Sequence, residues 1–233
     1  MQFAVIGLGQ FGFKVATTLA QMGGEVIAID SNRERVEEIK DQVTQAVCLD
    51  STDEKALRAA GIQDMDAVVV AIGENIETSI LTTALLKRLK VKRIIARAST
   101  NLQGQVLAEV GAEKVIYPED QMGEQVARSI IAPHILQHIT LQTGHSLVQI
   151  VPKKEFIGKT IKEINFRAKY GVNIIAIHRK VPTITETGES GFRIEVNDLP
   201  NPDDRIEETD ILVVVGSDEK IEKLARETEE GEK

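Results

Sequence analysis

The first 120 residues alternate short apolar runs, rich in β-branched residues, with longer segments whose apolar positions recur every three to four residues. This alternation predicts successive strand–helix units. Several of the runs are almost free of polar residues, which is typical of strands covered on both faces. The predicted strands are residues 3–6, 25–29, 46–49, 67–72, 93–96 and 114–117. Six units in a row predict an α/β fold with a doubly wound parallel sheet over residues 1–120.

Helix signals lie where this pattern requires them. Residues 11–19 repeat an apolar position every fourth residue, as an amphipathic helix does. Gly23 follows as a stop signal, and Ser31 or Asn32 is placed to cap the next helix.

The pattern changes after residue 120. An apolar stripe formed by Met122, Val126 and Ile130 predicts a crossover helix, which Pro133 should end or kink. Residues 137–145 read as a linker, so we assign 121–144 to a crossover helix and linker. A small α+β lobe over 145–233 is predicted from strands at 147–151, 173–179 and 211–215, helices at 160–166 and from 218, and a hairpin region containing glycine.

Composition narrows the possible functions. The chain has 233 residues with only 6 Phe, 2 Tyr and no Trp, so aliphatic side chains must fill the core. The net charge is −8, and residues 203–233 carry 12 acids and 5 bases, or −7 of it. The remaining body is close to neutral, which argues against nucleic acid as a partner.

The single cysteine excludes an intramolecular disulfide and a cysteine metal cluster. Cys48 falls within the third predicted strand, where we expect a buried core thiol. No apolar run approaches the roughly 18 residues that span a bilayer, and no signal peptide precedes the first strand. These features are typical of a soluble, cytoplasmic protein.

A glycine motif joins the first strand to the first helix. Gly7, Gly9 and Gly12 form the GxGxxG spacing, which gains meaning from this strand–turn–helix context. Gly7 allows the tight turn, Gly9 lets the backbone approach a pyrophosphate, and Gly12 lets the helix pack close to the strand. The free N–H groups of the helix N-terminus would then face the phosphates, with Gln10 and Phe11 in its first turn.

Asp30 ends the second predicted strand, 18 residues after Gly12. A carboxylate at this place accepts hydrogen bonds from both ribose hydroxyls of an adenosine, and it disfavours the 2′-phosphate of NADP. The alternative is that Asp30, followed by Ser31, serves only to cap the next helix.

Further polar residues follow the later strands, at the edge of the sheet where parallel strands end. Each has a simpler alternative: Asp50, Ser51 and Thr52 can cap a helix, Arg97 can pair with a neighbouring acid, and Glu119 can be a first-turn helix acid rather than a ligand of a divalent metal ion. The full candidate set for a nucleotide site is Gly7, Gly9, Gln10, Phe11, Gly12, Asp30, Ser31, Asp50, Ser51, Thr52, Ile72, Gly73, Asn75, Arg97 and Glu119.

The sequence does not assemble a catalyst at this edge. His134, His138 and His145 fall in the predicted crossover and linker, and His178 in a strand of the small lobe. A dehydrogenase needs an acid–base group beside the nicotinamide, so we assign no catalytic residue and expect no enzyme. The alternatives are a small NAD-dependent oxidoreductase and a free-standing nucleotide or redox sensor.

Five segments carry a family resemblance: QFAVIGLGQFG at 2–12, VVAIGENI at 69–76, SILTT at 79–83, YPE at 117–119 and RAKYG at 167–171. Together they closely resemble the regulatory subunits of Ktr and Trk potassium-uptake systems, which are RCK (or KTN) domain proteins. The resemblance runs over essentially the whole chain.

The resemblance implies an N-terminal Rossmann lobe that binds ATP, ADP or NAD(H), a crossover helix that mediates dimerisation, and a C-terminal lobe with a further dimer contact. It implies homodimers assembled into an eight-membered ring at the inner face of the cell membrane, on a separate potassium-translocating membrane subunit. By position, Arg97 would meet the phosphates and Glu119 the terminal phosphate with a divalent cation at the intersubunit junction.

Two finer points follow from the resemblance. Ktr-type members usually carry arginine at the position of Gln10, where it meets the γ-phosphate across the dimer, so neutral Gln10 shifts weight from ATP toward ADP or NAD(H). In the C-terminal lobe, five residues resemble a surface that binds cyclic di-AMP in some members, with an ordinary core as the alternative: Ile161, Ile164, Arg167, Asn173 and Ile174.

Overall fold

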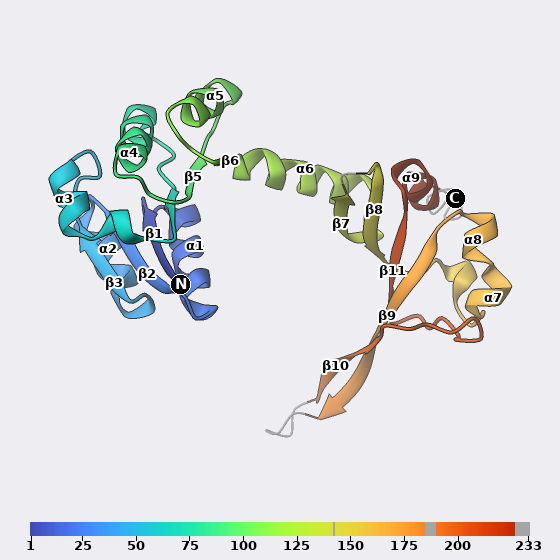
Figure 1. Ribbon diagram of the computed structural model, residues 1–233. Helices are drawn as coiled ribbons and strands as arrows, with labels where there is room; N and C mark the ends of the chain where they lie inside the picture. Colours follow the sequence, from blue (N-terminus) through green and yellow to red (C-terminus); the bar gives the residue numbers. More distant parts are fainter. Residues whose placement is uncertain (142, 185–189, 227–233) are drawn as a thin grey trace. The chain divides into compact units, whose positions relative to one another are not determined.

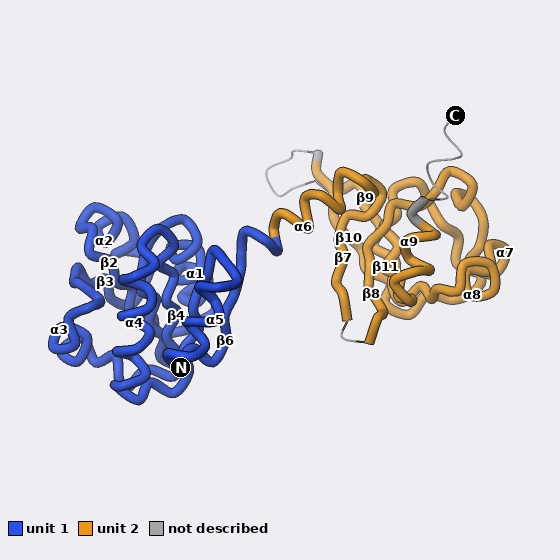
Figure 2. The backbone as a smooth tube through the Cα atoms, turned by 90° about the horizontal axis from the view of Figure 1, so that it is seen from above, with its two compact units in different colours: residues 1–121 blue, residues 122–233 orange. Residues whose placement is uncertain are grey.

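The computed structural model describes residues 1–141, 143–184 and 190–226 (Figure 1). The chain divides into two compact units, residues 1–121 and 122–233 (Figure 2). The division falls inside one helix, α6 (Pro118–Ile131). Within the described residues, no helix has the length and apolar character needed to cross a bilayer.

The first unit is built on a six-stranded parallel sheet in the order β3-β2-β1-β4-β5-β6, so the predicted doubly wound fold is confirmed. Its strands are β1 (Gln2–Ile6), β2 (Glu25–Asp30), β3 (Gln45–Cys48), β4 (Ala67–Val70), β5 (Ile94–Arg97) and β6 (Lys114–Ile116). The order reverses between β1 and β4, which is where open α/β sheets bind ligands.

Five α-helices connect these strands, with short 3₁₀ turns at Lys40–Gln42 and Ile62–Asp64. They are α1 (Gln10–Gln21), α2 (Arg33–Ile39), α3 (Glu54–Ala59), α4 (Ile76–Arg88) and α5 (Asn101–Glu109). Neighbouring side chains of β1 point to opposite faces of the sheet. Val5 packs in one core cluster with residues of α1 and α2, and Ile6 packs in another with residues of α3, α4 and α5. Both faces are therefore covered, which explains the nearly unbroken apolar strands of the sequence.

Cys48 corrects one expectation, because its thiol is exposed rather than buried in the core. The strand order places β3 at an edge of the sheet, where only β2 flanks it. Its Sγ lies 3.4 Å from the carbonyl oxygen of Ser31. An apolar stretch of sequence does not show whether its strand ends up at an edge or at the centre.

The second unit contains a five-stranded antiparallel sheet in the order β10-β9-β11-β8-β7. Its strands are β7 (Ile135–Leu141), β8 (His145–Ile150), β9 (Asn173–Ile184), β10 (Ser190–Asn197) and β11 (Asp210–Ser217). The helices are α7 (Ile161–Ile164), α8 (Phe166–Lys169) and α9 (Asp218–Arg226), with a 3₁₀ turn at Lys154–Phe156. Phe156, Phe166 and Tyr170 form an aromatic cluster in the core, with ring centroids 5.0–5.9 Å apart.

The linker predicted at residues 137–145 is wrong, because β7 and the start of β8 occupy it. His138 therefore lies in a strand that pairs with β8, opposite Val148. The predicted helix at 160–166 is two short helices, which Asn165 separates in the left-handed conformation (φ +55°). Helix α6 ends at Ile131, before Pro133, as expected.

An ion pair between the half-buried Arg179 and the buried Asp210 links β9 to the start of β11 in the second sheet. The Asp210 carboxylate is 1% exposed and accepts hydrogen bonds from Arg179 Nε (2.7 Å) and Nη2 (2.9 Å). It also accepts one from the backbone N–H of Glu207 at 2.8 Å. Because a buried charge is stable only when it is paired, Arg179 on β9 fixes the beginning of β11.

Replacing Arg179 with methionine should destabilise the second unit by about 3–5 kcal/mol, because the Asp210 carboxylate would remain buried without its cation. Hydrogen exchange followed by mass spectrometry should show faster exchange in β9 and β11 and no change in β1–β6. Arg128→Met, which breaks an exposed pair with Glu124, should have little effect on stability because solvent screens the pair. Equal exchange in both variants would contradict this assignment.

Candidate functional site

The turn between β1 and α1 is shaped by two glycines that the fold requires. Gly7 has a φ of +95°, a conformation that side chains disfavour, and its N–H donates to the Ile29 carbonyl at 2.8 Å. A Cβ added to Gly12 would lie 1.8 Å from the Gly7 carbonyl oxygen. Helix α1 therefore packs against the turn at a distance that only glycine at position 12 allows.

Gly9 is different, because none of the described residues requires it to be glycine. Its backbone is extended (φ −65°, ψ 179°), and a Cβ built on it meets no heavy atom within 4 Å. The space over Gly9 is therefore open, as close approach of a ligand to the backbone would require.

The N-terminus of α1 lacks the side-chain cap that the next four helices have. Side chains cap α2 to α5, namely Asn32, Asp53, Asn75 and Thr100. At α1 the N-cap is Gly9, which has no side chain, and the first turn has no acidic residue. The positive end of this helix and its unpaired N–H groups thus remain available to an anion.

A hollow of about 670 Å³ lies beside this helix end, at the carboxyl ends of β1, β2 and β4. Its volume falls within the range of small-molecule and cofactor sites. The candidate residues that line it are Gly7, Gly9, Gln10, Phe11, Asp30, Ser31, Asp50, Ser51, Ile72, Gly73, Asn75, Arg97 and Glu119. Gly12 and Thr52 are the candidates that do not line it. A ligand contact at any of the candidate positions stays a prediction.

Asp30 is buried at the edge of this hollow and already accepts two backbone hydrogen bonds. Its Oδ2 accepts from the Leu8 N–H at 2.6 Å, and its Oδ1 accepts from the Asn32 N–H at 2.8 Å. The side chain that caps α2 is Asn32, which accepts from the Glu34 N–H. Each oxygen of Asp30 keeps a second lone pair, so the carboxylate can orient the turn and still accept ribose hydroxyls.

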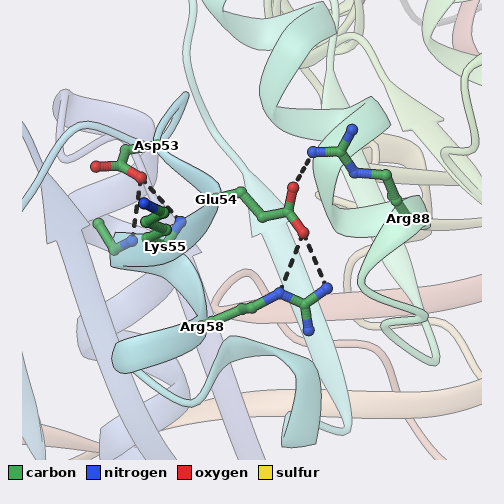
Figure 3. Close-up of polar contacts among 6 residues, drawn as sticks. Asp53, Glu54, Lys55, Arg58 and Arg88 are labelled. Atoms are coloured by element: carbon green, nitrogen blue, oxygen red, sulfur yellow. Dashed lines mark hydrogen bonds and ion pairs between the residues drawn. The ribbon is translucent and has the colours of Figure 1, made fainter.

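After the third strand, the cap of α3 is Asp53, whose Oδ1 accepts from the N–H groups of Lys55 and Ala56 (Figure 3). The neighbouring Glu54 pairs with both Arg58 and Arg88 and so ties α3 to α4. The capping role considered for residues 50–52 therefore belongs to Asp53.

Residues 50–52 instead make local contacts beside the hollow. Asp50 Oδ1 accepts from the N–H and the hydroxyl of Thr52, and these two hydrogen bonds lower the pKa of Asp50. The Ser51 hydroxyl lies 2.8 Å from that of Thr82 in α4, which ties the loop to the neighbouring helix. Asp50 and Ser51 line the hollow from this loop.

Arg97 supplies a cation at the opposite side of the hollow. Its guanidinium lies 6.0 Å from the centre of the Phe11 ring and pairs with Glu119. A Cβ on Gly73 would lie 2.1 Å from Arg97 Nη1, so the guanidinium occupies space that glycine leaves free. Its Nε is buried and has no hydrogen-bond partner within the described chain.

Glu119 is held ionised beside this arginine. Partial burial opposes ionisation of its carboxyl, but hydrogen bonds from its own N–H and from Arg97 outweigh this effect and lower the pKa of Glu119. Each simpler alternative therefore holds, because Arg97 pairs with a neighbouring acid and Glu119 is a first-turn acid of α6. Both residues also line the hollow.

The predicted divalent ion at Glu119 has little support within one chain. In the parts of the chain that the structure describes, no three or more His, Cys, Asp or Glu side chains gather as a metal site. A single carboxylate that already pairs with arginine does not fit a resident metal ion without further oxygen ligands.

Three polar lining residues were missed by the sequence analysis: Arg35, Glu74 and Thr78. Arg35 projects from α2, with Nη1 3.5 Å from Asp30 Oδ2. The sequence could have indicated Arg35 only by its position, five residues after Asp30 in the helix that Asn32 caps. Arg35 adds a second cation, next to the carboxylate expected to bind ribose.

The residues predicted for cyclic di-AMP lie in the second unit. Ile164 is buried in its core, and Ile161 and Ile174 pack against that core. Arg167 donates from Nε to Asn173 Oδ1 at 2.9 Å. The core explains the three isoleucines, and binding of cyclic di-AMP stays a prediction.

Known proteins resemble both units. The TrkA-N domain model matches residues 3–118, and the TrkA-C domain model matches residues 146–228. Ktr system potassium uptake protein C of Bacillus subtilis is 40% identical over 93% of this chain and 92% of its own length. Ktr system potassium uptake protein A of the same organism is 37% identical over 97% of this chain and 96% of its own.

Solved structures share the fold. The GsuK RCK domain matches 97% of this chain and 47% of its own, with a TM-score of 0.63 and 17% identity. The GsuK channel bound to NAD matches 97% of this chain and 38% of its own length, with a TM-score of 0.50 and 24% identity. GsuK bound to ADP matches 55% of this chain and 34% of its own length, with a TM-score of 0.50 and 14% identity. Together, the two domain matches and the Ktr relatives show that the chain belongs to the RCK-domain family of Ktr and Trk potassium-uptake regulatory proteins.

Proposed function

We propose that this protein is a nucleotide-binding regulatory subunit of a potassium-uptake system. The observation that carries the nucleotide part is the hollow at the switch point of the sheet, where an uncapped helix N-terminus meets open space over Gly9. The potassium part rests on relatives that are 37–40% identical over nearly their full lengths and are named as potassium uptake proteins.

The ligand that fits the lining is an adenine nucleotide with at least two phosphates. Asp30 would accept the ribose hydroxyls, the α1 N-terminus would hold a pyrophosphate, and Arg97 would meet the outer phosphate. ADP, ATP and NAD(H) share this chemistry. Neutral Gln10 at the helix start adds no charge for a γ-phosphate, which favours ADP or NAD(H). The GsuK structures described with NAD and with ADP support this choice of ligand class.

The proposed mechanism is a ligand-dependent conformational equilibrium and not a chemical reaction. Arg97 now pairs with Glu119, which begins helix α6 next to Pro118. A phosphate that binds Arg97 would compete with the Glu119 carboxylate and so change what holds the start of that helix. Such a switch needs different ligand affinities in two states, typically a difference of about 1–3 kcal/mol.

The partners in this proposal are a second copy of the chain, a larger ring of such dimers, and a potassium-translocating membrane subunit that holds the ring at the inner face of the membrane. A divalent ion would join only together with nucleotide phosphates, since Glu119 offers one carboxylate. The chain would act on the membrane subunit without catalysing a reaction.

The function is tested by potassium flux into liposomes that contain a Ktr- or Trk-type membrane subunit. With this chain added, the potassium flux measured with ADP, with ATP and with NADH should differ. The chain should also co-purify with the membrane subunit. Flux that is unchanged by the chain would refute the regulatory role. Flux that the chain changes equally with and without every nucleotide would refute the dependence on nucleotide. Reduction of a substrate by NADH at the same site would favour an oxidoreductase instead.

Gly9→Ala tests whether the open space over the helix start is a ligand site. The backbone tolerates alanine there, so the thermal stability of the free protein should hold, while affinity for ADP and NADH should fall about tenfold because the methyl group occupies the phosphate position. Calorimetry measures the affinity. Gly123→Ala, whose Cβ also meets no atom within 4 Å, is the matched control and should bind normally. Unchanged binding by Gly9→Ala would place the ligand elsewhere.

Arg97→Gln tests the outer phosphate contact. Loss of a charge-assisted hydrogen bond should weaken ADP binding about tenfold and leave the binding of adenosine, which has no phosphate, nearly unchanged. Arg93→Gln is the control, because Arg93 precedes the same strand and pairs with Glu113 outside the hollow. An equal loss for ADP and adenosine would mean that Arg97 shapes the site and does not bind phosphate.

A further inference from the structure

The outer half of the β9–β10 hairpin forms a ribbon of two strands. Strand β11 pairs with β9 only as far as Arg179, whereas β10 continues to pair with β9 over residues 180–184 (Figure 1). Two-stranded ribbons are marginally stable in water without a third strand or a packed face. The described part of the chain provides neither, because β10 is an edge strand with β9 as its one neighbour.

The free edge of β10 carries an unusual amount of exposed apolar surface. Phe192, Ile194 and Val196 are 73%, 57% and 58% exposed. They alternate along the strand, so they share one face, and Arg193 and Glu195 share the other. An edge strand with outward N–H and C=O groups and an apolar face is a template for pairing with another strand.

The order of residues along β10 is self-complementary. In an antiparallel pair of two β10 strands with Ile194 on the two-fold axis, Phe192 lies opposite Val196 of the partner subunit. Arg193 then lies opposite Glu195 of the partner subunit, and Glu195 opposite the partner's Arg193. Since Arg193 also pairs with Glu195 in its own strand, the four charges alternate in sign around the axis.

Among the registers centred on residues 193 to 195, this one matches both faces. An axis at residue 193 or 195 would set two arginines or two glutamates directly opposite each other, which destabilises a strand pair. A two-fold axis between two residues would place charged side chains opposite apolar ones. The apolar side chains of the two strands would then lie on opposite faces of the sheet. The charge order therefore specifies both the occupant and its alignment.

We propose that β10 pairs antiparallel with β10 of a second copy of this chain, with the two-fold axis at Ile194. The two ribbons become one four-stranded sheet, and the apolar stripes of both copies join on one face. The contact involves few residues and is smaller than typical stable interfaces, so it serves an assembly that also has other contacts. This inference does not depend on the nucleotide site.

Disulfide cross-linking tests directly which β10 residues of the two copies lie opposite each other. In full-length protein with Cys48→Ser, Ile194→Cys should cross-link to a second copy on mild oxidation with diamide. Residues opposite each other in antiparallel strands have Cα atoms about 4.5–5.5 Å apart, which suits a disulfide. Phe192→Cys alone and Val196→Cys alone should not cross-link, whereas a mixture of the two should, because each lies opposite the other.

Charge variants give a second, independent readout. Arg193→Glu in the Ile194→Cys background should slow cross-linking about tenfold, because two attractive cross-strand pairs become repulsive. Adding Glu195→Arg restores opposite charges and should restore the rate. No cross-link through residue 194, equal cross-linking of all three single variants, or no rescue by the double charge swap would each overturn the proposal.

Discussion

The close approach of α1 to the turn after β1 is the constraint on which the first unit's site depends. With Gly12 directly above the Gly7 carbonyl oxygen, the helix begins at the end of the central strand and points its N-terminus into the hollow. A larger residue at position 12 would push the helix away and carry the backbone N–H groups out of reach. The sheet order then brings β4 and its loop to the other side of the same point, so two chain segments far apart in sequence complete one site.

Charge in this site is arranged by what each group already contacts. Asp30 and Asp50 are held by backbone N–H groups, so their carboxylates stay oriented without a ligand. Arg97 is held by Glu119, an exposed acid that a phosphate can replace, and α1 is capped by no side chain at all. The two carboxylates are therefore preorganised, whereas Arg97 and the N-terminus of α1 can exchange one partner for another. In the proposed function, this difference would make the phosphates the part of a ligand that changes the protein.

Sequence reasoning succeeded where local pattern and topology agree. Buried parallel strands are aliphatic on both faces, so β1 to β6 could be recognised one by one. The glycine spacing predicted a site at their ends, where the hollow lies. It failed where the deciding neighbour is remote in the chain. The exposure of Cys48 follows from the edge position of β3, and β7 mixes Gln137, His138 and Thr140 with its apolar residues because only part of it is covered. Arg35 was missed because its approach to Asp30 depends on how α2 packs.

The two sheets differ in which of their parts are left exposed. The parallel sheet has helices on both faces and exposes the ends of its strands. The hollow therefore lies at the strand ends, next to backbone groups of the turn after β1. The antiparallel sheet has β10 and β7 as its edges, and exposed apolar side chains lie on both strands, including Ile139 and Phe192. Edges recognise other strands through main-chain hydrogen bonds, with alternate side chains setting the register. The proposed ligand site at the strand ends of one unit and the proposed self-recognition along a strand edge of the other thus use different backbone groups.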